Sequence, residues 1–202
     1  AYLKVQVNDA STANITMPEG YLFTTTINGV TYQFVNTEAR IIQPSNGIYV
    51  FGSTSGIPVY EGTWATTRFT TNLSDVDQKF IIPNTNVDIS TISVQVQTSA
   101  SDVTTTNYVE ANSLVDITSE TNAYFTQETV NGEWEIYFGD GVVGNALIDG
   151  NIVILKYVVT NGEEANGAAS FSAAALISGF GDIATTTMTS ASGGAEAENL
   201  DC

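Results

Sequence analysis

Residues 21–36, YLFTTTINGVTYQFVN, alternate apolar and hydroxyl-bearing side chains on both sides of an Asn-Gly pair. This dipeptide best tolerates the two positive φ angles of a two-residue type I′ turn. With that turn, Phe23 faces Phe34 and Ile27 faces Val30 on an apolar side, and threonines occupy the other side. One apolar and one polar face are what a half-buried antiparallel hairpin requires. The segment therefore limits the chain to a fold built on antiparallel β-sheet.

A second hairpin is predicted around the Asn-Gly pair at residues 131–132, between YFTQETV and EWEIYF. A two-residue loop sets Phe125 against Phe138 on an aromatic-rich face. The same register opposes Glu128 and Glu135, which like-charge repulsion disfavours. A cation from another chain is one way in which this repulsion could be offset.

The run IVILKYVV predicts a strand over residues 152–159 with apolar side chains on both faces. Such a strand is central in a sheet or covered by a partner. Ile152, Ile154 and Tyr157 of this strand, together with Trp134 of the second hairpin, are therefore candidate interface residues.

Charge and composition exclude several classes of function. The chain has 22 Asp and Glu against 5 Lys and Arg, a formal charge of −17, which repels nucleic acid and anionic membranes. It has no His, and its single Cys is Cys202, so zinc clusters, disulfides and Ser-His or Cys-His nucleophile pairs are excluded. No apolar run reaches the roughly 18 residues of a membrane helix. We expect no cofactor, metal, nucleic acid, membrane or small-molecule substrate, and no enzymatic activity.

Carboxylate pairs leave one catalytic route open, because glycoside hydrolysis needs only two acids about 5 to 10 Å apart. Asp75 with Asp77, or Glu133 with Glu135, would meet that spacing. Chance pairs are expected in so acidic a chain, which favours a solvated acidic surface. Asp88 could join Asp75 and Asp77 in weak Ca²⁺ binding, although no complete set of oxygen ligands is visible.

The block FGDGVVG could form an anion or cation loop. Phosphate loops need a longer glycine spacing and a Lys or a helix start, and an EF-hand needs acids at alternating positions with a Glu at the twelfth. Neither pattern is present. We interpret the block as a structural turn, in which an inward aromatic anchors the loop, glycines permit its path and an Asp caps it. Its residues are Phe138, Gly139, Asp140, Gly141 and Gly144.

The predicted fold is mainly β, with antiparallel hairpins forming one or two β-sandwich-like domains and little helix. Residues 1–60 form an N-terminal β-hairpin region, residues 61–170 a β domain carrying the FGDG block, and residues 171–202 a small-residue arm leading into a truncated helix start. The sequence begins without Met and stops at GGAEAENLDC. We therefore expect it to be an internal fragment of a longer protein.

Three blocks in order, KFIIPNTNVDISTISVQVQTS, ETNAYFTQETVNGEWEIYFGDGVVGNALIDGNIVILKYVVTNGEEANGAASF and SASGGAEAENLD, resemble the baseplate J-like family. The likeness is to the baseplate wedge ring subunits of T4-type contractile-tail bacteriophages, and it covers residues 60–201. Asn145 stands where relatives frequently have a basic residue.

This resemblance implies a structural protein of the virion, made in the host cytoplasm and placed in the tail baseplate. It implies a homodimer of the subunit in each wedge, contacts with other baseplate proteins, and a ring whose changes are coupled to sheath contraction. Two alternatives from other classes are a carbohydrate-binding β-sandwich adhesin module that uses Trp64 and Trp134, and a hydrolase that uses carboxylates alone.

Overall fold

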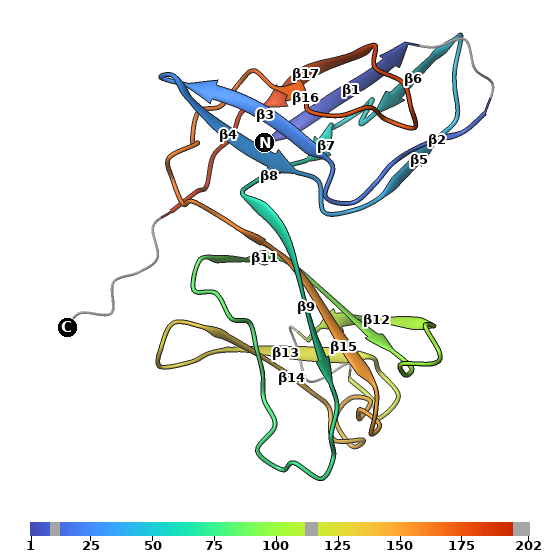
Figure 1. Ribbon diagram of the computed structural model, residues 1–202, viewed down its shortest axis with the longest axis vertical. Helices are drawn as coiled ribbons and strands as arrows, with labels where there is room; N and C mark the ends of the chain where they lie inside the picture. The colour runs from blue at the N-terminus through green and yellow to red at the C-terminus, as the bar shows by residue number, and fades with distance from the viewer. Residues whose placement is uncertain (9–12, 112–116, 196–202) are drawn as a thin grey trace. The chain divides into compact units, whose positions relative to one another are not determined.

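The computed structural model describes residues 1–8, 13–111 and 117–195, and every regular element in these ranges is a β-strand (Figure 1). The predicted mainly-β, antiparallel class is confirmed. Within the described ranges there is no helix with the length and apolarity to cross a membrane. The expected helix start after the Gly pair falls at residues 196–202, outside the described residues.

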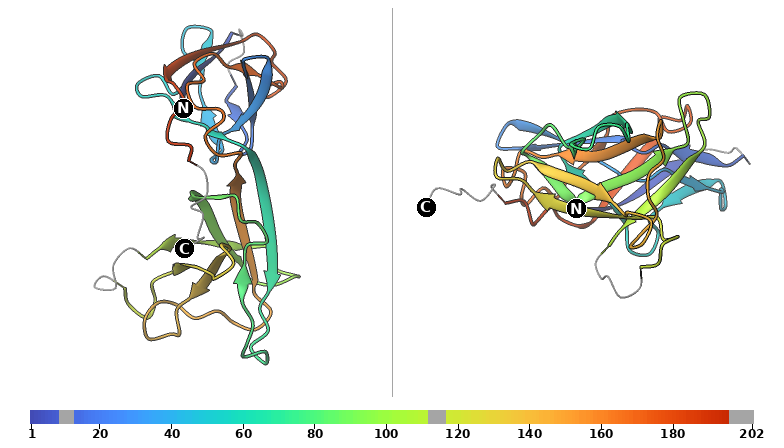
Figure 2. Two further views of the ribbon diagram at one scale, coloured as in Figure 1. Left: turned by 90° about the vertical axis from the view of Figure 1, so that its left-hand side faces the viewer. Right: turned by 90° about the horizontal axis from the view of Figure 1, so that it is seen from below.

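The chain divides into two compact units, Ala1–Trp64 with Val158–Cys202, and Ala65–Tyr157. The boundary falls inside strands β9 (Thr63–Thr70) and β15 (Ile152–Val159), which are paired neighbours in one sheet (Figure 2). The first unit therefore combines the two ends of the sequence, and the second is continuous.

Three sheets make up the first unit. One has the order β17-β1-β6, with β7 also paired to β1; its strands are β1 (Tyr2–Asn8), β6 (Ile48–Phe51), β7 (Ile57–Pro58) and β17 (Ile183–Thr189). Another has the order β16-β3-β4-β8; its strands are β3 (Leu22–Ile27), β4 (Val30–Val35), β8 (Tyr60–Glu61) and β16 (Ser172–Ala173). The third pairs β2 (Ile15–Met17) with β5 (Arg40–Ile42).

The β3–β4 hairpin has the register predicted from its turn residues. Phe23 pairs with Phe34 and Ile27 with Val30. Asn28 and Gly29 both have positive φ, 50° and 83°, as a type I′ turn requires. The local dihedral preferences of these two residues therefore fix how the whole hairpin pairs.

The larger sheets of the first unit share one hydrophobic core, which gives a sandwich-like packing. Leu3 and Val5 of β1 are fully buried in the same cluster as Phe23 of β3 and Phe34 of β4. Segments after residue 160 add Ala165, Ala168, Phe171, Ile177 and Ala191 to this cluster. The small residues near the C-terminal end thus lie against the core of the N-terminal strands.

Hydroxyl groups hold the small-residue segment in place. The side chain of Thr187 in β17 donates to the Ala169 carbonyl at 2.8 Å, and that of Thr185 donates to the Phe171 carbonyl. β17 itself pairs antiparallel with β1. The alternating threonines therefore bond the neighbouring segment while the backbone completes the sheet.

Glu61 joins β8 to the chain that leaves β15. Its carboxylate accepts hydrogen bonds from the Thr160 hydroxyl at 2.9 Å, the Asn161 backbone N–H at 2.8 Å and the Asn161 side-chain amide at 2.7 Å. Hydrogen bonds to a charged group contribute more than neutral ones. Because Thr160 and Asn161 are remote from Glu61 in sequence, these hydrogen bonds join two distant segments of the chain.

Glu61→Ala is expected to lower the free energy of unfolding of the first unit by about 2 kcal/mol, because the Asn161 N–H and the Thr160 hydroxyl lose their acceptor. Urea unfolding of the variant measures the effect. Glu163→Ala is the matched control, since Glu163 is an exposed acid in the same unit, and it should change the value by less than about 0.5 kcal/mol. Equal effects of both changes would contradict the role assigned to Glu61.

The second unit holds a seven-stranded sheet in the order β10-β14-β13-β12-β11-β15-β9. In addition to β9 and β15, its strands are β10 (Phe80–Ile81), β11 (Val87–Gln97), β12 (Thr105–Glu110), β13 (Ala123–Glu128) and β14 (Trp134–Phe138). The β12–β13 pair is parallel, whereas β11–β12, β13–β14 and β10–β14 are antiparallel.

The two end strands of this sheet come together through aromatic rings. Phe69 of β9 and Phe80 of β10 pack edge to face with ring centroids 5.6 Å apart. Phe80 packs in the same way on Phe138 at 5.6 Å, and Phe138 on Tyr108 of β12 at 5.4 Å. Since β9 and β10 are the first and last strands of the order, the sheet is nearly closed into a barrel around these rings.

The predicted register of the β13–β14 hairpin is wrong by one residue. Phe125 pairs with Tyr137, and Glu128 pairs with Trp134. The loop has three residues rather than two, since the Thr129 N–H donates to the Glu133 carbonyl at 2.8 Å and only the glycine of the Asn-Gly pair has positive φ. This is the geometry of a type I turn followed by a glycine bulge.

The shifted register removes the repulsion that the two-residue loop would impose. Glu135 lies opposite Gln127 instead of Glu128. Its carboxylate also accepts from the Lys79 ammonium at 3.2 Å. A cation of the same chain therefore compensates Glu135.

β15 is a central strand, one of the two alternatives that its apolar faces indicated. It lies between β11 and β9, and Val153, Leu155 and Val158 are fully buried. β15 therefore has a hydrogen-bonded strand on each edge, and most of its side chains are buried.

Candidate functional site

The FGDG block forms a corner that leaves β14 and returns beside it. The Gly141 N–H donates to the Gly144 carbonyl at 3.0 Å, and Gly139 forms a bridge with Ala146. The Gly144 N–H donates to the Thr118 carbonyl at 3.1 Å. The corner is therefore tied both to itself and to the chain that precedes β13.

Two of its glycines are required for different reasons. A Cβ on Gly139 would lie 2.3 Å from the carbonyl carbon of Gly144 and 2.4 Å from the Val143 oxygen, which are backbone atoms. Gly141 has a φ of +86°, and a Cβ there would make only an ordinary contact with the Ala146 Cβ at 3.8 Å. Close approach of two backbone segments explains Gly139, and a left-handed conformation explains Gly141.

Asp140 caps the corner. Its Oδ1 accepts from the Val142 N–H and the Val143 N–H, both at 2.9 Å. These bonds, that of Val143 first, hold the pKa of the exposed Asp140 carboxyl below its ordinary value of 3.8. Both donors belong to the same loop, so the carboxylate satisfies backbone groups that the sharp turn leaves unpaired.

The pH dependence of stability should report this cap. Because the pKa of Asp140 is lower in the folded than in the unfolded chain, the cap stabilises the fold above about pH 3.8 and this stabilisation is lost as pH falls through the lowered pKa. Asp140→Asn keeps the acceptor oxygen but cannot titrate. The difference in unfolding free energy between wild type and Asp140→Asn should therefore shrink on acidification, measured by urea unfolding across the acid range. A difference independent of pH would contradict this assignment.

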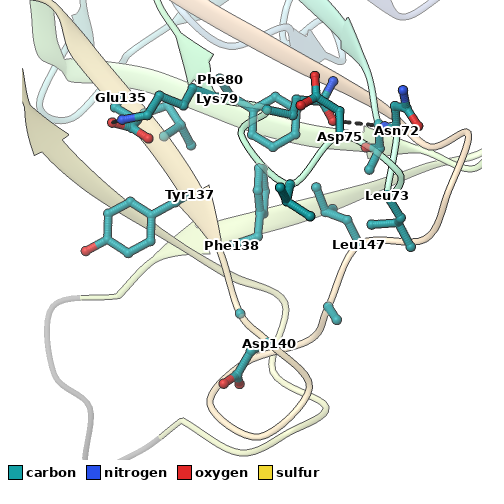
Figure 3. A pocket seen from close by; sticks show the side chains of 16 residues that line it. Asn72, Leu73, Asp75, Lys79, Phe80, Glu135, Tyr137, Phe138, Asp140 and Leu147 are labelled. Atoms are coloured by element: carbon teal, nitrogen blue, oxygen red, sulfur yellow. Dashed lines mark hydrogen bonds and ion pairs between the residues drawn. The ribbon is translucent and has the colours of Figure 1, made fainter.

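An open groove of about 370 Å³ lies beside this corner, and we call it the β14 groove. It runs between the loop of residues 71–79 and the segment from β14 through the FGDG corner. Figure 3 shows Lys79, Glu135 and Tyr137 on one side, Asn72, Leu73 and Asp75 on the other, and the rings of Phe80 and Phe138 between them. The groove is lined by Thr71, Asn72, Leu73, Asp75, Val76, Gln78, Lys79, Phe80, Glu135, Ile136, Tyr137, Phe138, Gly139, Asp140, Ala146 and Leu147.

Of the candidate interface residues, two are accessible and two are buried. Trp134 and Ile152 are half-buried. Ile154 and Tyr157 are 3% exposed, and the Tyr157 hydroxyl shares a hydrogen bond of 2.7 Å with Thr67. The interior of the second unit thus already covers Ile154 and Tyr157.

The acidic candidates mostly stabilise their own turns. Asp75 accepts from the Asp77 N–H at 3.2 Å, and Asp88 accepts from the Ser90 hydroxyl at 2.6 Å. Glu135, half of a proposed carboxylate pair, is engaged with Lys79. Among the described residues, no three His, Cys, Asp or Glu side chains gather as metal ligands would.

The two tryptophans belong to different compact units, Trp64 to the first and Trp134 to the second. Trp64 packs over Gly20, where an added Cβ would lie 2.7 Å from the indole Cδ1. A packing role within the first unit accounts for Trp64.

In the loop of residues 71–79, the sequence indicated only the acids Asp75 and Asp77 as candidate site residues, and not the apolar Leu73 and Val76. The loop exposes Leu73 and Val76, 59% and 92% accessible, next to the FGDG corner. An apolar residue in a run such as NLSDVDQK is a weak signal, because single exposed apolar residues are common on protein surfaces. Only the fold places these residues beside Phe138.

Residues 67–160 match the family described as Bacteriophage baseplate wedge protein gp6, third domain. The second compact unit is therefore similar to a phage baseplate domain. The chain is also 31% identical over 75 residues to the baseplate wedge protein gp6 of Enterobacteria phage T4, an alignment that covers 30% of this chain and 11% of that protein. Over residues 67–160 the chain is similar to the baseplate wedge proteins, which confirms the resemblance found in its sequence.

Proposed function

We propose that this chain is a structural part of a phage tail baseplate, positioned in the virion as a wedge component without enzymatic activity. One observation carries the proposal: the segment that matches the gp6 third domain, residues 67–160, coincides with the compact unit Ala65–Tyr157. Because the matched segment begins and ends close to the limits of the compact unit, the match supports the proposal that the chain has inherited the whole domain together with its place in the assembly.

The proposal includes the contacts that the sequence resemblance implied. The chain pairs with a second copy of itself in the wedge, binds other baseplate proteins, and transmits changes that accompany sheath contraction. The FGDG corner contributes rigidity, since its bonds tie β14 to the chain before β13. A formal charge of −17 favours basic surfaces on neighbouring subunits.

Removal of the gene from the phage that encodes the chain tests the structural role. Particles made without it should lack complete baseplates in electron micrographs, and the full-length protein supplied from a plasmid should restore them. A version lacking residues 65–157 should be expressed but fail to restore them. Intact, infectious particles without the protein would overturn the proposal.

Light scattering of the full-length protein at low and high salt tests the wedge homodimer separately. A dimer that persists at high salt is expected, because two acidic copies must associate through uncharged surfaces. A monomer at both salt concentrations would remove the homodimer from the proposal and leave the baseplate location standing. Binding to basic neighbours should instead weaken at high salt, since salt screens exposed charges.

A further inference from the structure

We propose that the β14 groove is the docking site for a different baseplate subunit, and that its occupant is a basic segment carrying a large apolar side chain. This inference rests on the proposed function and specifies one partner surface of it. Three properties of the molecule support it: the groove presents apolar surface on a fixed frame, its rim is acidic, and the 202 residues of a second copy have few cations to offer.

The apolar surface of the groove is held in place by hydrogen bonds rather than left on a loose loop. The Leu73 N–H donates to Asp149 at 2.9 Å, and the Asn72 N–H donates to the Gln78 side chain at 2.8 Å. The Gln78 amide in turn donates to the Thr70 carbonyl at 2.8 Å. These bonds anchor the loop to its surroundings, and the loop still exposes the apolar side chain of Val76 at 92%.

Exposed apolar groups grouped around a concave site are typical of protein interaction surfaces. Leu73 lies at one side of the groove and Tyr137, 42% exposed, at the other, and Val76 also lines it. Phe80 and Phe138 lie between these walls (Figure 3). An apolar side chain inserted here would contact aromatic rings and lose its water, which is how anchor residues contribute most to binding.

The charge of the rim determines the kind of partner. Asp75 and Asp140 are exposed carboxylates, and Glu135 of β14 also lines the groove. Lys79 is the cation of the lining and already bonds Glu135 at 3.2 Å. The groove therefore carries net negative charge and favours Lys or Arg beside the apolar anchor.

A second copy of this chain is a poor source of such a segment. Its five basic residues all lie in the described ranges: Lys4, Arg40, Arg68, Lys79 and Lys156. Arg40 is paired with Glu38, Lys79 with Glu135, and Lys156 also has a partner within the chain. Against 22 acids these residues cannot supply a basic segment, so these 202 residues of a second copy are not the occupant.

Photo-cross-linking in assembled tails tests this assignment. The full-length protein, carrying a photoreactive amino acid at position 76 or at position 130, is supplied to phage that lack the gene. Val76 and Val130 are 92% and 96% exposed in the same unit, but only Val76 lines the groove. Tails are irradiated, and cross-linked peptides are identified by mass spectrometry.

The expected result is a link from position 76 to a peptide of a different baseplate protein. That peptide should have Lys or Arg within a few residues of an apolar contact residue. Position 130 should give no such link. A link to a second copy, a link to an acidic peptide, or no link from position 76 in complete tails would overturn the inference alone. Absence of the protein from tails, judged by immunoblot before irradiation, would overturn the proposed function together with the inference.

A pair of substitutions gives an independent readout. Val76→Asp should reduce incorporation into tails about tenfold or more, because it places a charge among acids at a desolvated contact. Val130→Asp should leave incorporation within about twofold, since rim and remote contacts contribute little. Both variants should unfold at the wild-type urea midpoint because both side chains are exposed. Equal incorporation of the two variants would overturn the inference.

Discussion

Phe80→Ala is expected to lower the free energy of unfolding of the second unit by about 4 kcal/mol. Phe80 is 8% exposed and packs edge to face on both Phe69 and Phe138. Removing the ring leaves a cavity where the first and last strands of the sheet meet. Urea unfolding measures the loss, in a Trp64→Phe background so that fluorescence reports Trp134 of the second unit.

Phe80→Leu separates the volume of the ring from its edge-to-face contacts. It keeps most of the apolar volume and should cost about 1 to 2 kcal/mol, since each aromatic pair adds about 0.5 to 1.5 kcal/mol beyond burial. A cost of Phe80→Ala no larger than that of Phe80→Leu would mean that β9 and β10 do not depend on this ring.

Gly139→Ala is expected to destabilise the second unit by about 3 kcal/mol. The new methyl group would lie 2.3 Å from the Gly144 carbonyl carbon and 2.4 Å from the Val143 oxygen. Because both are backbone atoms, relief requires the corner to open and its bridge to Ala146 to break. The same urea measurement applies, and amide hydrogen exchange should rise locally at Val142 and Val143.

Gly141→Ala, in the same loop, is the matched control. It meets no atom closer than the Ala146 Cβ at 3.8 Å, and its φ of +86° alone should cost about 1 kcal/mol. If the two alanine variants were equally stable, the close approach of Gly139 and Gly144 would not be what holds the corner.

These two predictions bear on the partner surface as well as on stability. Phe80 and Gly139 both line the β14 groove. The hydrogen bonds that close the corner run to Asp140 from the backbone N–H groups of Val142 and Val143, whose side chains are exposed. A corner opened by Gly139→Ala should therefore weaken subunit contacts at this groove along with the fold.

Local sequence was sufficient to predict the strand class and one complete hairpin. Asn28 and Gly29 prefer the positive φ angles that a two-residue turn requires, so they determine the pairing of Phe23 with Phe34 without help from the rest of the chain. Apolar residues on both faces of β15 predicted a strand that is either central or covered by a partner, and the structure places it inside its sheet.

The register of the β13–β14 hairpin was decided by the tertiary structure. An Asn-Gly pair fits a two-residue turn and also a three-residue turn with a glycine bulge, so residues 131–132 do not distinguish them. The three-residue loop lets Glu135 meet Lys79, a residue far from it in sequence. The sequence window around the turn contains no sign of that ion pair.

The sequence by itself therefore determined what depends on neighbouring residues: antiparallel strands, the tight β3–β4 turn and a glycine-rich block suited to a corner. The tertiary structure decided what depends on contacts across long separations, including the meeting of Phe69 with Phe80, the close approach of the FGDG corner to Thr118, and the β14 groove. The physical reason is that backbone dihedral preferences act over a few residues, whereas packing and charge pairing act between any residues that the fold brings together.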